Sequence, residues 1–92
     1  MLHWSNGAVG ATVVTVIPDG TGDVTSNIIF MVALDNAGSK LSFMVQLNVG
    51  QSTNLNVGAG TWTFAVSAGG ELTVQRTAGS GTAKITLLGC WV

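Results

Sequence analysis

Apolar and polar residues alternate with a period of two along most of this chain, and helical periodicity is nearly absent. Residues 61–67 are the clearest example: Trp62, Phe64 and Val66 share one face, and two threonines and a serine lie on the other. Successive side chains of a strand point to opposite sides, so this alternation is typical of a strand with one buried face. The chain therefore predicts an all-β fold.

Turn-forming residues divide the chain into predicted strands. These cover residues 8–17, 27–34, 41–49, 54–57, 61–67, 71–76 and 82–88. Paired glycines at 69–70 and the run Asp-Asn-Ala-Gly-Ser at 35–39 suit hairpin turns, and the last three strands are expected to form a meander. Turns recurring about every ten residues predict one small antiparallel domain over residues 1–92. We expect a β-sandwich or barrel of about seven strands, in a jelly-roll or immunoglobulin-like order.

Charged residues are unusually scarce. Lys and Arg together number 3 and Asp and Glu 4, which is 8% of the chain, against about 25% in an ordinary soluble domain. Three scattered basic residues cannot form the basic patch that nucleic acid requires, so no nucleic-acid partner is expected. The longest apolar run, residues 28–34, is far shorter than the roughly 20 residues of a membrane-spanning helix. Residues 1–7 lack the features of a secretory signal, so no membrane partner is expected either.

Catalytic and metal-binding combinations are also scarce. His3 is the only histidine and lies in a terminus expected to be mobile, whereas a hydrolytic triad needs a positioned base. Asp19 and Asp23 flank a Gly-Thr-Gly turn but lack the spacing and the closing Glu of a calcium loop. Cys90 is the only cysteine, so no disulfide can form within the chain, and a buried inert thiol is expected. We predict no enzyme, no cofactor and no metal.

Three tryptophans are half of the aromatic residues. Trp62 falls on the inward face of its predicted strand and is expected in the core. Trp4 and Trp91 lie near opposite ends of the chain, where a solvent-facing indole needs a role. Docking against a neighbouring subunit is the favoured role, because tryptophan is enriched at interface anchors. The alternative is a platform on which a sugar ring stacks.

The strand predicted at residues 27–34 breaks the alternation, because it is apolar on both faces. One face carries Ile28, Phe30, Val32 and Leu34, and the other carries Ile29, Met31 and Ala33. The next strand adds Met44 to the second face. A two-layer sandwich has one core, so the second face needs a cover. We expect another chain to cover it, with Ile29, Met31 and Met44 at the interface; a barrel with this strand under a terminus is the alternative.

The run Gly-Thr-Trp-Thr-Phe-Ala-Val-Ser-Ala-Gly-Gly at residues 60–70, within a short chain rich in Gly, Thr, Ser and Val, resembles the small accessory proteins of bacteriophage virions. These include capsid decoration proteins and the head-binding domains of fibres. The resemblance, in composition and strand spacing, implies a homo-oligomer, a trimer being one form, on a capsid or tail lattice. It also implies synthesis in the host cytoplasm and a place in the virion. Sandwich modules of carbohydrate-active enzymes show a similar alternation and give the alternative function, carbohydrate binding.

Overall fold

The computed structural model describes residues 2–18 and 26–91, of which residues 90 and 91 are described by their backbone only. This part of the chain contains strands and no helix. The strands are β1 (Leu2–Val9), β2 (Val14–Ile17), β3 (Asn27–Asn36), β4 (Ser39–Asn48), β5 (Ser52–Val57), β6 (Gly60–Val66), β7 (Leu72–Gly79) and β8 (Ala83–Trp91). The all-β prediction is therefore confirmed.

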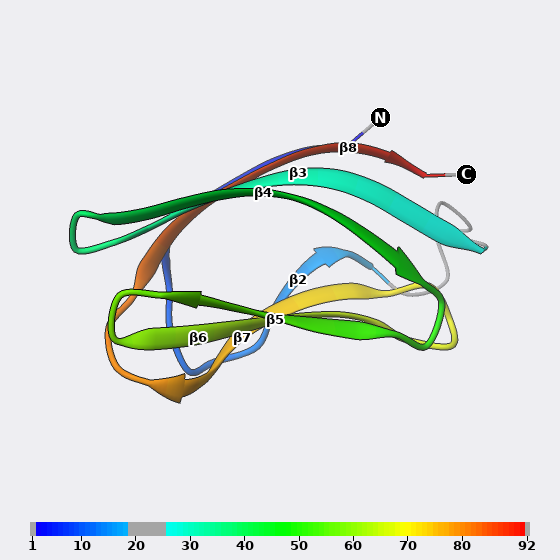
Figure 1. The fold of residues 1–92 in the computed structure, drawn as a ribbon. Coiled ribbons are helices and arrows are strands. Elements are labelled where there is room, and N and C mark those ends of the chain that lie inside the picture. The colour runs from blue at the N-terminus through cyan, green and yellow to red at the C-terminus, as the bar shows by residue number, and fades with distance from the viewer. Residues whose placement is uncertain (1, 19–25, 92) are drawn as a thin grey trace.

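The strands form two antiparallel sheets of four that stack face to face (Figure 1). The first sheet has the order β1-β8-β3-β4, and the second has the order β2-β7-β6-β5. Neither sheet closes on itself, so the structure is a sandwich and the barrel alternative is wrong. The alternative in which β3 lies in a barrel and is covered by a terminus is therefore wrong as well.

The described residues form eight strands, so the prediction of seven was wrong. The strand expected at residues 8–17 is two strands in different sheets, separated by a corner that begins at Gly10. Two hydrogen bonds hold this corner, because the carbonyls of Gly10 and Ala11 accept from the Arg76 N–H and the Gln75 amide. β1 also begins at Leu2, within the segment expected to be mobile. Its residues pair with β8 from the Leu2–Gly89 position onward.

The meander expected from the last three strands was also wrong. β6 and β7 pair as expected, but β8 lies in the first sheet between β1 and β3. The glycine-rich segment after β7 is a crossover between sheets instead of a hairpin turn. A Cβ on Gly79 would lie 1.9 Å from the carbonyl oxygen of Ala59, so the crossover passes too close to the β5–β6 turn for any other residue.

Two predicted hairpins are confirmed. Ala37 and Gly38 join β3 to β4 with positive φ angles of 52° and 92°, the combination of a two-residue type I′ turn. The β6–β7 turn uses Gly70, with φ at 87°. Ser67 closes this second turn, because its hydroxyl accepts the Glu71 N–H at 3.0 Å. These turns set the register of both strand pairs.

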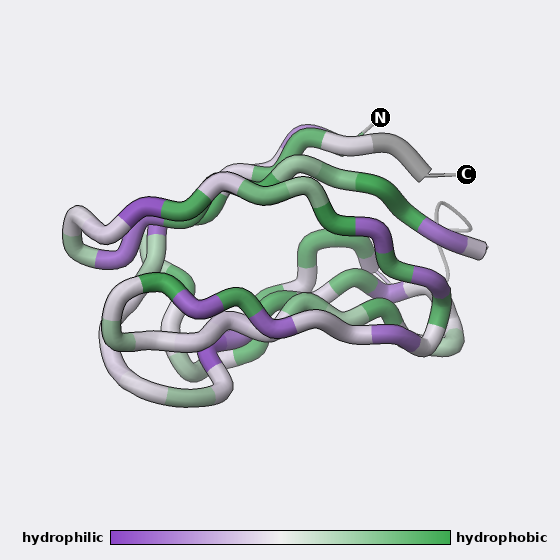
Figure 2. Tube along the Cα trace, in the orientation of Figure 1, coloured by the Kyte–Doolittle hydropathy of each residue, from purple (hydrophilic) through white to green (hydrophobic). Residues whose placement is uncertain are grey.

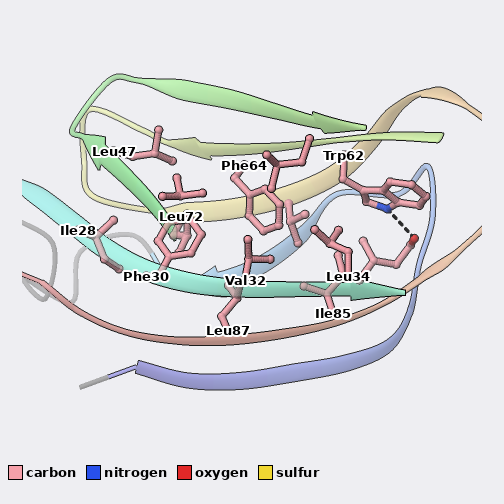
Figure 3. Packing of buried hydrophobic residues seen from close by; sticks show 14 of the residues in the cluster. Ile28, Phe30, Val32, Leu34, Leu47, Trp62, Phe64, Leu72, Ile85 and Leu87 are labelled. Atoms are coloured by element: carbon pink, nitrogen blue, oxygen red, sulfur yellow. Dashed lines mark hydrogen bonds between the residues drawn. The ribbon is translucent and has the colours of Figure 1, made fainter. Parts of the chain in front are cut away.

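The core lies between the sheets and is made of the inward-facing side chains of both (Figure 3). Alternate residues of β3 (Ile28, Phe30, Val32 and Leu34) face the aromatic residues of β6. The rings of Phe30 and Phe64 lie 5.7 Å apart between centroids and are tilted by 47°, a favourable geometry for an aromatic pair. The core is therefore one layer of interdigitated side chains from two sheets.

Trp62 links the two sheets at one end of this core, as expected for a core residue. Its side chain is fully buried, and its indole Nε1–H donates to the Val9 carbonyl at 2.9 Å (Figure 3). Gly60 provides room for the ring, since a Cβ there would lie 2.6 Å from it. The hydrogen bond satisfies a polar group that burial would otherwise make costly.

Replacing Trp62 with Phe should therefore lower the free energy of unfolding by about 2–4 kcal/mol, because the Val9 carbonyl loses its donor and part of the ring volume becomes a cavity. Urea denaturation measures the loss. Trp4→Phe is the matched control: Trp4 is half-buried, and the change should cost less than about 1 kcal/mol. Equal losses in the two variants would contradict the role assigned to Trp62.

Asn36 links the sheets at the hairpin end of β3. Its side chain is polar and buried, and its Nδ2 donates to the Val57 carbonyl at 3.0 Å and to the Ser80 carbonyl at 3.5 Å. One amide group thus ties β3 to the end of β5 and to the β7–β8 crossover. Gly81 must stay small beside it, because a Cβ there would lie 2.5 Å from the Asn36 Oδ1.

Asn36→Ala should lower the free energy of unfolding by about 1–3 kcal/mol, because it leaves a buried carbonyl without a donor. Asn56→Ala is the control, since Asn56 is exposed and bonded only to the Thr61 hydroxyl among described residues; it should cost about 0.5 kcal/mol or less. Urea denaturation of both variants tests this. A neutral Asn36→Ala would show that the link is not needed for stability.

Candidate interaction surface

The outer face of the first sheet carries the apolar residues that the broken alternation of β3 predicts. Ile29 and Met31 lie on the solvent side of β3, and Met44 lies on the solvent side of β4. Their exposed fractions are 39%, 47% and 64%. In Figure 2 the tube of β3 stays green between its hydrophilic ends, whereas a strand with one wet face would alternate in colour.

Leu88 of β8 joins these residues and was missing from the predicted set. It is 50% exposed and lies opposite Met31, which in turn lies opposite Met44. The row therefore runs from His3 of β1 through Leu88 and Met31 to Met44. The consecutive leucines at 87 and 88 were the available signal, since one of them must point away from the core.

We call Ile29, Met31, Met44 and Leu88 the apolar patch. Together these side chains expose on the order of 400 Å², which is within the range of the largest apolar patches on soluble monomers, patches that are often functional. Uncharged side chains border it: Gln46 lies opposite Ile29, and Ala33 in the next row lies between Thr86 and Ser42. Such a border costs little to desolvate compared with a charged one.

Charges gather one row further, at the hairpin end of the sheet. Asp35 lies between Lys40 and Lys84 in the register of β4, β3 and β8. A shallow open hollow there is lined by these three residues and by Leu41 and Ser42, among others. The Asp35 carboxylate also accepts the Gly38 N–H of the hairpin turn at 2.9 Å. The hollow is open and holds no histidine, so we assign it no catalytic role.

The outer face of the second sheet is different, because its polar side chains bond to one another. The hydroxyls of Thr61 and Thr63 donate to the side-chain oxygens of Asn56 and Asn54, each at 2.7 Å. Thr63 also shares a hydrogen bond of 2.7 Å with Thr77. These cross-strand pairs stabilise the sheet itself, so on this face the threonine hydroxyls and the asparagine amide oxygens bond to one another.

Neither of the two tryptophans whose side chains the structure describes belongs to the apolar patch. Trp4 lies opposite the buried Leu87 and is half-buried against the core. Trp62 is fully buried. The side chain of Trp91, also predicted at an interface, lies outside the described residues. Of the two described indoles, that of Trp62 is buried and that of Trp4 is partly exposed.

Of the residues considered for catalysis or metal binding, His3 has a side chain within the described part of the chain. His3 is exposed on β1 and lies opposite Leu88. Asp19, Asp23 and the thiol of Cys90 lie outside the described part of the chain. Within that part, no group of three or more His, Cys, Asp or Glu side chains could hold a metal ion.

Comparison of this chain with protein-family models, with curated proteins and with solved structures gave no match. Among the described residues, no helix has the length and apolar character that crossing a membrane requires.

Proposed function

We propose that this chain is a non-enzymatic structural protein of a bacteriophage virion, a β-domain that self-associates and decorates or stabilises a capsid or tail. The observation that carries the proposal is the apolar patch on the outer face of the first sheet. An apolar area of this size with an uncharged border is suited to another protein surface. Few charges surround it, so the contact would depend little on salt.

We infer that the chain path is related to a jelly roll. The first strand pairs with the last and the second with the seventh, as in the outer strands of a jelly roll. The inner strands depart from that pattern, because β3 pairs with β4 and β5 pairs with β6 as two separate hairpins. An immunoglobulin-like sandwich instead pairs its first strand with its second, whereas here β1 and β2 lie in different sheets. An eight-stranded sandwich of this kind is compatible with a capsid-associated protein.

The rival function is carbohydrate binding. The paired hydroxyls and amides of the second sheet could contact a glycan, but the half-buried Trp4 weakens the case for an indole platform. A glycan array read by tryptophan fluorescence separates the two functions: a decoration protein should give no signal, and a specific glycan signal would favour the rival.

Purified phage particles from the strain that encodes the chain should contain it as a regular component. Tryptic peptides, such as the one from Leu41 to Arg76, identify it by mass spectrometry. Met31→Lys should reduce incorporation at least about tenfold, because a charge in the apolar patch must be desolvated on docking.

Thr73→Lys places the same charge on the outer face of the second sheet and is the control, expected to be incorporated normally. Particles without the protein, or equal incorporation of both variants, would contradict the proposed docking surface.

A further inference from the structure

The two open sheets leave four edge strands, and only β4 is a long and regular one. β1 and β2 each contain a shift in register where they pair, and β5 has six residues. β4 has ten residues and pairs with β3 position by position, without a shift. It contains no proline, and its one charged residue is Lys40 near its start. β4 therefore lacks most of the devices by which proteins prevent edge pairing.

The backbone groups that β4 leaves open follow from its hairpin. In a two-residue turn, Asn36 and Ser39 form the hydrogen-bonded pair that flanks the loop, and hydrogen-bonded pairs alternate from there. The N–H and C=O groups that point away from β3 therefore belong to four alternate residues. These are Lys40, Ser42, Met44 and Gln46.

Asn48, the next residue in this alternate series, supports the assignment. Its N–H donates to the Gln51 side chain at 2.9 Å, and its carbonyl accepts the Gln51 N–H at 3.0 Å, both away from β3. No hydrogen bond between described residues engages the open backbone groups of Lys40, Ser42, Met44 or Gln46. The edge is thus a row of four residues ready to pair.

Phe43 lies at the centre of this row and is poorly covered. It lies opposite Val32, which is buried in the core, so its side chain points inward between the sheets. Phe43 is nevertheless 52% exposed, because the first sheet ends at β4. A further strand beyond β4 would cover the ring.

We propose that β4 pairs antiparallel with β4 of a second copy, about a two-fold axis at Phe43, and joins two first sheets into one continuous sheet of eight strands. In this register Ser42 lies opposite Met44 of the second copy, and Lys40 lies opposite its Gln46. All four open residues are paired, and the two Phe43 rings meet at a close, non-hydrogen-bonded position.

The chemistry of β4 favours a second copy as the occupant. The four open residues are symmetric about Phe43, so the strand is complementary to itself in the antiparallel direction. The two Lys40 side chains lie at opposite ends of the pair, so no like charges face each other. Pairing also places two apolar patches side by side.

The inference adds to the proposed function, since the edge joins two copies while the apolar patch stays free to dock. Sedimentation velocity should show a dimer for the purified chain at high micromolar concentration. Ser42→Pro should raise the dimer dissociation constant at least about tenfold, because the ring removes an edge donor and blocks approach. The Ser42 N–H takes no part in pairing with β3, so circular dichroism should show an unchanged fold. Ser42→Ala keeps the donor and should dimerise like the parent chain.

A charge pair tests the register. Phe43→Lys and Phe43→Glu should each weaken the homodimer, because like charges then face each other across the axis. An equimolar mixture of the two variants should restore a dimer. Met31→Lys should dimerise normally, which separates failure of the dimer from failure of patch docking.

A purified chain that stays monomeric at high micromolar concentration would overturn the edge dimer. So would a Ser42→Pro chain that dimerises as well as Ser42→Ala, or an oligomer of another order that Ser42→Pro leaves intact. Failure of the mixed Phe43 variants to pair would overturn the register. These results test the self-association part of the proposed function. Docking of the apolar patch is tested separately, by comparing incorporation of the Met31→Lys and Thr73→Lys chains.

Discussion

The stacking of two four-stranded sheets gives this chain one core, and a strand in such a core can bury only the side chains on its inward face. β3 carries apolar residues on both faces, so burying Phe30 and Val32 leaves Ile29 and Met31 in solvent. The apolar patch is therefore a consequence of the two-layer architecture. Its side chains can change without altering the core, so we expect their character to reflect binding more than folding.

A part of the fold could be predicted from the sequence where interactions within the segment itself set its conformation. The turn at Ala37 and Gly38 was predictable because positive φ angles and strand twist are set within the hairpin itself. The segment around Gly79 and Gly81 has the same composition but crosses between sheets. Its path is decided by contact with Ala59 and Asn36, which are distant in sequence. Composition alone cannot distinguish a hairpin turn from such a crossover.

The residues of the candidate surface could likewise be predicted only where the signal is local in the sequence. The exposure of Ile29, Met31 and Met44 could be predicted because a break in alternation is visible within one strand and its neighbour. Leu88 required the pairing of β8 with β3, which joins residues far apart in the chain. The position of Trp4 near the end of the sequence suggested a solvent-facing indole and gave no information on its packing. Pairing of β1 with β8 instead turns its indole toward the core.

The two outer faces of the sandwich therefore differ in polarity and in how they interact with water. On the second sheet, the hydroxyls of Thr61 and Thr63 bond the amide oxygens of Asn56 and Asn54, and polar side chains of this kind interact favourably with water. On the first sheet, the apolar patch gains free energy only when water is removed from it. The proposed decorating role requires this difference, because such a protein must attach by one side and remain soluble on the other.

An edge dimer would keep the apolar and polar outer faces on opposite sides. It would also strengthen attachment to the surface on which the apolar patch docks. Met44 lies on β4 itself, so the two patches would meet at the joined edge, where adjacent strands differ by about 20–25° of twist. Both second-sheet faces would remain on the far side. One docking event would then engage two patches, and the second contact would form at the high effective concentration that physical linkage provides. Weak contacts by single copies would thereby become firm attachment of the pair.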